Sequence, residues 1–187
     1  MAREIRQQDQ EQELRQRLNR LRERAEEYRG RLSPEDLRRA PPAGGWSIGV
    51  VFEHLCIAED TYHEAMEARL AAAASDPGAP AATWRPSLAG GLLVRSFRSP
   101  RKMAAPGIYQ PGPEPRPGVI DAYLERIRRT GELLSRASGV RWRAIRLSSP
   151  VSRLIRINLG DGFDILVTHA ERHYDQIERI KGSLGIA

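Results

Sequence analysis

The spacing of apolar residues predicts four amphipathic helices in this chain. In the first, over residues 3–29, the apolar residues recur every three or four positions and therefore share one face. They are Leu14, Leu18, Leu21, Ala25 and Tyr28. The same spacing predicts helices over residues 47–74, 119–137 and 161–181.

Residues at the predicted helix ends support these boundaries. Gly30 follows the first helix and Gly139 follows the third, as is common after a helix. Ser47 and Asp161 are favoured capping residues for the starts of the second and fourth helices. Between the first two helices, Ser33 caps a short Pro-Glu-Asp turn.

Two connections between the helices are long. Residues 75–118 are rich in Pro, Gly and Ala, with one short helix predicted over Leu88–Phe97, and loops of this length often belong to a binding site. Residues 140–160 are expected to be irregular, with alternating apolar residues at their end. The chain is therefore predicted to be a single all-α domain over residues 1–187, a four-helix bundle with a long crossover between the second and third helices.

Composition excludes several classes of protein. A chain of 187 residues with 40% hydrophobic and 29% charged residues suits one globular domain with a core. No apolar run approaches the roughly 18 residues of a membrane-spanning helix, and the polar N-terminus is unlike a signal peptide. Cys56 is the single cysteine, so we expect neither a disulfide nor a cysteine zinc site, but a small packing residue. A cytoplasmic protein with no membrane partner is predicted.

Positive charge is distributed unevenly along the chain, whose net charge is +6. Residues 85–116 carry six basic residues and one acidic one, and residues 141–156 carry five basic residues and none acidic. A solvated surface is the simplest interpretation, and an anion-binding or nucleic-acid-binding surface is the alternative. No predicted helix has a one-sided basic stripe, so nucleic acid is the least favoured partner.

Two of the four histidines lie one turn apart on the fourth predicted helix. His169 and His173 share a face with Leu166, Gln176 and Ile180, so both rings are expected to point into the bundle. Two imidazoles at this spacing can bind one metal ion. Burying them side by side without partners would cost free energy.

A third histidine is expected to face the same interior. His54 lies among the apolar residues Val51, Leu55 and Ala58 of the second helix, whereas His63, nine residues later, is rotated about half a turn away. We therefore predict a metal site, in preference to hydrogen-bonded core histidines. Its ligands are His54, His169 and His173. Zinc is the default divalent ion, and nickel, iron and manganese are alternatives because imidazole suits several metals.

The residues around the histidine pair differ from those of a metalloprotease. Position 170 is Ala and Glu171 lies on another helix face, so the general base of an HExxH motif is missing. No catalytic side chain is predicted beyond a metal-bound water or thiolate. Gln176 and Trp46 are predicted to line the pocket, and a plain polar position on the helix surface is the alternative for Gln176.

Two motifs resemble the DinB superfamily of metal-binding four-helix bundles. They are GGWSIGVVFEHL at 44–55 and HAERHYDQI at 169–177, with weaker similarity in RKMAAPGIYQP at 101–111 and SPVSR at 149–153. The resemblance implies a DinB-like bundle in which the three family metal ligands fall on His54, His169 and His173. Together with the long first helix, it also implies a homodimer.

Members of this superfamily differ in chemistry and include bacillithiol S-transferases, mycothiol-dependent isomerases and hydrolases. The resemblance thus implies a metal-dependent enzyme that transfers a low-molecular-weight thiol to an electrophilic substrate in detoxification or stress response. A metal-dependent hydrolase and a non-catalytic metal-binding or ligand-binding bundle are the alternatives. The two basic segments would suit an anionic thiol, so charge reversal at their arginines is expected to weaken thiol binding. The arginines chosen for that test are Arg95, Arg98, Arg143 and Arg146.

Overall fold

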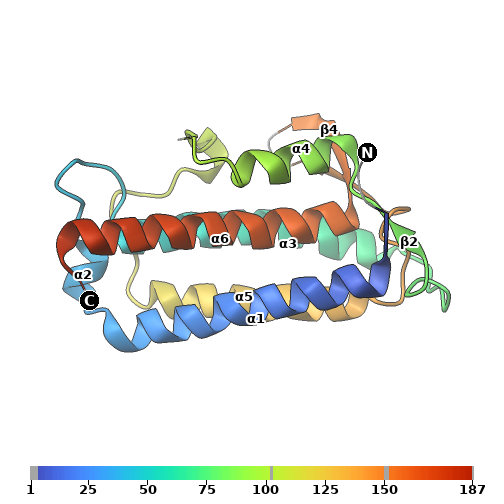
Figure 1. The fold of residues 1–187 in the computed structure, drawn as a ribbon, viewed down its shortest axis with the longest axis horizontal. Helices are drawn as coiled ribbons and strands as arrows, with labels where there is room; N and C mark the ends of the chain where they lie inside the picture. The colour runs from blue at the N-terminus through green and yellow to red at the C-terminus, as the bar shows by residue number, and fades with distance from the viewer. Residues whose placement is uncertain (1–3, 102, 150–151, 187) are drawn as a thin grey trace.

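Four long helices dominate a computed structural model that describes residues 4–101, 103–149 and 152–186 (Figure 1). They are α1 (Gln7–Arg31), α3 (Ile48–Ala71), α5 (Val119–Ala137) and α6 (Leu159–Leu184). Both α1 and α3 pack against α5 and α6, which gives each helix two neighbours in the bundle. The prediction of an all-α four-helix bundle is confirmed.

Chain direction explains the long crossover. In Figure 1, α3 and α5 run in one direction while α1 and α6 run in the other. The connection between the parallel helices α3 and α5 therefore has to travel back along the bundle. On its way it forms strand β2 (Thr83–Trp84), helix α4 (Leu88–Phe97) and the 3₁₀ helix η1 (Gly107–Tyr109), and α4 packs on α6. The short helix predicted within this connection is confirmed.

Apolar faces of the four helices meet in one core. All five apolar residues predicted to share a face of α1 are buried there. On α3 and α5 the buried face includes Met66 and Leu133, whereas Ala65 and Leu124 are only partly buried. Among the described residues, no helix combines the length and the apolar character needed to cross a membrane.

The first helix extends past the glycine predicted to end it. Gly30 lies inside α1, which continues to Arg31 and ends at Leu32, a buried residue of the core. A side chain at Gly30 would meet no atom within 4 Å, so nothing at this position forces the helix to stop. The short turn that follows is helix α2 (Pro34–Arg38), and Ser33 caps it as predicted, in a reciprocal capping box with Asp36.

A β-hairpin replaces much of the segment expected to be irregular. Strand β3 (Arg146–Ser149) pairs antiparallel with β4 (Ser152–Asn158), and Leu147 lies opposite Ile157. The alternation of apolar residues before α6 is thus the period of a strand, in which successive side chains point to opposite faces. A second small sheet joins strand β1 (Ile5–Arg6) to β2 and ties the start of the chain to the crossover.

The residue that caps α6 is Asn158 rather than Asp161. Helix α6 begins at Leu159, and Asp161 is the third residue of a capping box whose carboxylate accepts a 2.8 Å hydrogen bond from the Asn158 amide. The same carboxylate accepts hydrogen bonds of 3.1 and 3.2 Å from the amide of Ser87, which caps α4. Asp161 therefore fastens the start of α4 to the start of α6.

Candidate metal centre

Three histidine side chains from two helices converge inside the bundle. The Nε2 atom of His169 lies 3.1 Å from the Nε2 atom of His54 and 3.1 Å from that of His173. With imidazole bonds to a metal of about 2.0–2.1 Å, two ligands of one ion stand about 2.9–3.4 Å apart for angles between octahedral and tetrahedral. The histidines that the sequence spacing singled out are thus close enough together to hold one metal ion.

The tautomer of His54 is set by a backbone carbonyl. Its Nδ1 lies 2.8 Å from the carbonyl oxygen of Tyr109, in the 3₁₀ helix η1. A carbonyl can only accept a hydrogen bond, so Nδ1 carries the proton and Nε2 keeps its lone pair. That lone pair is directed at the other two histidines.

On α6, Gln176 fixes the ring of His173 in the same way. The Gln176 Oε1 atom accepts a 2.9 Å hydrogen bond from Nδ1 of His173, which again leaves Nε2 unprotonated. A neutral His169 has one N–H and can donate it to only one of these two lone pairs, whereas a cation would accept a lone pair from all three rings. The donor set therefore fits a metal ion, and Gln176 lines the cavity next to one of the candidate ligands.

A tight turn places Trp46 against the histidines. Gly44 and Gly45 adopt φ of +78° and +105°, a region that strongly favours glycine, immediately before α3 begins. Trp46 follows them, and its ring centroid lies 4.9 Å from that of His54 and 6.4 Å from that of His173. Gly45 and Trp46 thus line the cavity beside the histidines.

Burial keeps the three imidazoles neutral. It is the main cause of a lowered pKa at His54, against the opposing hydrogen bond to Tyr109. It lowers the pKa of His169 well below its usual range and that of His173 to about 3. The charges of Arg172 and Arg179 contribute further to the lowering at His173. At neutral pH each ring is therefore unprotonated and able to donate a lone pair to a metal.

The histidines line a cavity of about 900 Å³. Its walls come from α3, α4, η1, β4 and α6, and they are mostly apolar or aromatic; Phe97 of α4 places its ring centroid 5.0 Å from that of His169. Among the described residues that line it, none is Asp or Glu. A cavity of this size holds a small molecule beside the candidate metal ligands.

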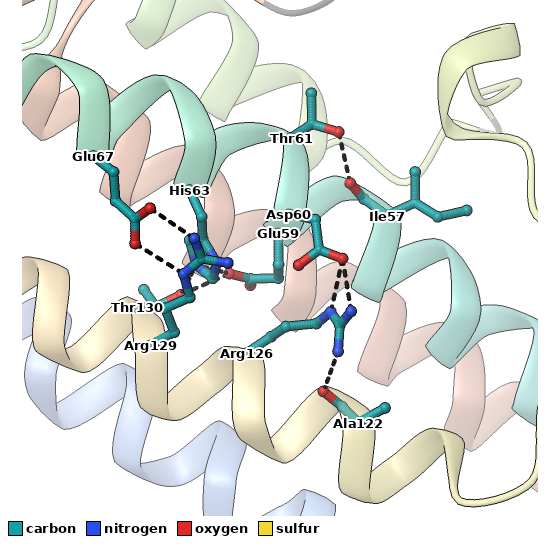
Figure 2. Close-up of polar contacts among 10 residues, drawn as sticks. All are labelled: Ile57, Glu59, Asp60, Thr61, His63, Glu67, Ala122, Arg126, Arg129 and Thr130. Carbon is teal, nitrogen blue, oxygen red and sulfur yellow. Dashed lines mark hydrogen bonds and ion pairs between the residues drawn. The ribbon is translucent and has the colours of Figure 1, made fainter.

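His63 lies outside the cluster, as its rotation on the helix predicted. It is fully buried and faces α5, where its Nε2 lies 2.7 Å from Thr130 Oγ1 and 3.1 Å from Glu59 Oε2 (Figure 2). Thr130 in turn donates a 2.6 Å hydrogen bond to Glu59. Ion pairs of Arg126 and Arg129 flank this network, which joins α3 to α5 away from the cavity.

The positive charges beside the cavity differ from those predicted. Of the four arginines chosen from the basic segments, none lines it: Arg95 and Arg98 border a separate hollow on α4, while Arg143 and Arg146 are exposed elsewhere. The arginines that do line it are both on α6, at positions 172 and 179. Counting charge along the sequence missed them because they stand in a helix of mixed charge.

The structure also bears on the expectations for Cys56 and Glu171. Cys56 is fully buried in the hydrophobic core, where burial raises the pKa of its thiol to about 12 and keeps it protonated, in keeping with a packing residue. Glu171 pairs with Arg17 of α1 at 2.6 Å, away from the histidines, so it is not a base for this site.

Comparison with protein-family models gives a match to the DinB superfamily over residues 14–177. The chain belongs to the DinB superfamily. The matched range includes His54, His169 and His173 and every described residue of the cavity lining except Arg179, which lies two residues beyond it. Searches of curated proteins and of solved structures found no match.

Proposed function

We propose that this DinB protein is a divalent-metal-dependent enzyme that transfers a low-molecular-weight thiol to an electrophilic substrate. The observation that supports it best is the cluster of three neutral imidazoles in a cavity of about 900 Å³ whose described lining has no carboxylate. His54, His169 and His173 would hold the ion. When bound, it would supply Lewis acidity, which lowers the pKa of a coordinated thiol or water.

Residues around the histidines would hold the site in shape. The Tyr109 carbonyl and the Gln176 side chain keep the protons of His54 and His173 on Nδ1, so both Nε2 atoms stay available. The rings of Trp46 and Phe97 pack beside the imidazoles and reduce the access of water. The apolar part of an electrophile would bind against these rings and the neighbouring aliphatic side chains.

The composition of the cavity favours thiol transfer over hydrolysis. Hydrolysis by a metalloprotease-like mechanism uses a carboxylate as general base, and no described residue of the lining provides one. Thiol transfer needs no such base. The sulfur forms a bond to the electrophilic carbon, the leaving group departs with its electron pair, and the thiol proton passes to solvent.

Metal content tests the ligand set. After reconstitution with zinc, wild type is expected to hold about one ion per chain, and His54→Ala and His173→Ala none, because two imidazoles bind an ion far more weakly than three. His63→Gln is the matched control, since it removes a buried histidine of the same helix outside the cluster. Equal zinc in His54→Ala and in wild type would contradict the site.

Activity tests the reaction class. We expect the zinc-loaded protein to accelerate conjugation of at least one thiol (cysteine, glutathione, bacillithiol or mycothiol) to 1-chloro-2,4-dinitrobenzene, measured by thioether absorbance. The rate should fall to background in His54→Ala and persist in His63→Gln. Ester hydrolysis without conjugation would indicate the hydrolase alternative. Stoichiometric zinc with neither reaction would indicate a non-catalytic bundle.

A further inference from the structure

Two arginines of the cavity wall have no carboxylate partner. Arg172 and Arg179 both lie on α6, and His173 and Gln176 stand between them in the sequence. Within the part of the chain that the structure describes, neither guanidinium forms an ion pair. Arg172 is partly buried and Arg179 is exposed, so two positive charges border the cavity, and none of its described lining residues is negative.

The guanidinium of Arg172 is held in place by backbone oxygens. It donates hydrogen bonds to the carbonyls of Phe97, at 3.0 Å, and Ser99, and one of 2.5 Å to the carbonyl of Arg101. These bonds join α6 to the end of α4 and satisfy N–H donors, but neutral carbonyls do not cancel the charge. Arg172 is thus a fixed positive charge beside the site.

Acidic residues of α6 are engaged elsewhere or stand apart. Glu171 and Asp164 both pair with Arg17 of α1, and Glu178 is bonded to Tyr28 and Arg24. Asp175 is exposed and forms no ion pair with any described residue. The helix therefore leaves the charge in the cavity to be balanced by something other than its own side chains.

The opposite end of the same cavity is apolar. Ile165 and Leu166 begin the row of α6 residues that line it, and Arg179 ends the row, about 21 Å further along the helix axis at 1.5 Å per residue. Opposite the apolar end lie Leu92 of α4 and Ile155 of β4, which line the cavity although 60% and 41% of their surface is exposed. These two side chains give that end of the cavity a partly open apolar rim.

We propose that the cavity binds an amphipathic anion, with a carboxylate or similar group at Arg172 and Arg179 and an apolar body over α4 and β4. Two positive charges in a mostly apolar cavity are stabilised by an anion and left unbalanced by a neutral ligand of the same shape. The inference rests on the proposed function in one respect: the anion would be the electrophilic substrate or the thiol-conjugated product of that reaction. Binding itself requires no metal.

Calorimetry on the metal-free protein tests this inference with octanoate and its neutral analogue octanol. We expect octanoate to bind at least tenfold more tightly than octanol. Arg179→Gln should reduce octanoate affinity towards that of octanol and leave octanol affinity unchanged. Arg95→Gln is the matched control, since this exposed arginine lies on α4 outside the cavity, and it should bind octanoate as wild type does.

Three results would overturn the inference: equal affinity for the two probes, no binding of either, or an equal loss in Arg95→Gln and Arg179→Gln. These outcomes are separate from the test of the reaction. Failure of octanoate binding together with normal zinc content and thiol transfer would remove only the anion site. Octanoate binding that persists in a protein without thiol transfer would remove only the proposed reaction.

Discussion

Two buried tyrosine hydroxyls differ in their hydrogen bonding. The Tyr174 hydroxyl donates a 2.9 Å bond to the carbonyl of Leu21, whereas the hydroxyl of Tyr109 has no partner among the described residues. A buried hydroxyl without a partner costs about 1–3 kcal/mol, and a paired one contributes about 1 kcal/mol. Replacing each tyrosine by phenylalanine is therefore expected to change the free energy of unfolding in opposite directions.

Tyr109→Phe is expected to raise the free energy of unfolding by about 1 kcal/mol, since it removes a hydroxyl that is desolvated and unpaired. Tyr174→Phe should lower it by about 1 kcal/mol, since it removes a paired one. Urea unfolding of both variants beside wild type checks the difference. A loss in Tyr109→Phe as large as that in Tyr174→Phe would mean that Tyr109 has a partner in solution.

Sequence spacing was sufficient to find the three histidines, because a helical repeat specifies which side chains share a face. It was insufficient for the groups that hold them. The partner of His54 is a backbone carbonyl, which has no residue type of its own, and Phe97 ends a short helix whose packing against α6 is a tertiary contact that spacing along the chain does not specify. The arginines of the cavity were missed for a related reason, since local charge density does not indicate the direction in which a side chain points.

At the scale of elements, α4 depends on one close approach to α6. An added Cβ at Gly90 would lie 2.3 Å from the carboxyl carbon of Asp161, so only glycine fits against the group that fastens the two helices. At the neighbouring Gly91, an added Cβ would be 3.7 Å from Pro86, an ordinary contact. Both glycines lie in the same helix and differ in their surroundings.

We expect Gly90→Ala to destabilise the protein by about 2 kcal/mol through steric overlap and to weaken octanoate binding as α4 shifts. Gly91→Ala should leave binding unchanged and raise stability by up to about 1 kcal/mol, because alanine favours the helix. Thermal unfolding and calorimetry on the two variants test this. Similar losses in both would contradict the specific role of the contact with Asp161.

Helices and hairpin differ in how far the sequence predicts them. The long helices follow from repeats sustained over five or more turns. The hairpin strands span only four and seven residues, and the alternation that marks β4 covers few positions, so tertiary contacts decide its structure. Asp161 was mistaken for the cap of α6 because acidic residues are favoured both at the cap and in the first turn of a helix.

At the scale of the whole molecule, the histidine cluster makes stability depend on pH. Burial lowers the pKa of all three rings, so the metal-free native protein keeps them neutral as the pH falls, to about 3 for His173. The unfolded chain takes up protons below about pH 6.5. The contribution of the three neutral rings to the free energy of unfolding is therefore fully present above that pH. On acidification it is lost, by about 1.4 kcal/mol per pH unit for each histidine.

His173→Gln should reduce this dependence. Between pH 6 and pH 4 the free energy of unfolding of the metal-free variant is expected to fall less steeply than that of wild type, by about 1.4 kcal/mol per pH unit, because one fewer group takes up a proton on unfolding. Urea titrations at pH 7, 6, 5 and 4 measure the two slopes. Parallel curves would show that His173 is protonated equally in the native and unfolded states.

The hydrogen bond between His54 and the Tyr109 carbonyl has a consequence for how relatives of this chain can vary. Every amino acid supplies a backbone carbonyl, so replacing the residue at position 109 leaves the acceptor in place. An insertion or deletion in the stretch that leads to η1 would instead carry the acceptor away from the ring. In relatives that keep the three histidines, the length of this stretch should thus vary less than the amino acid at position 109.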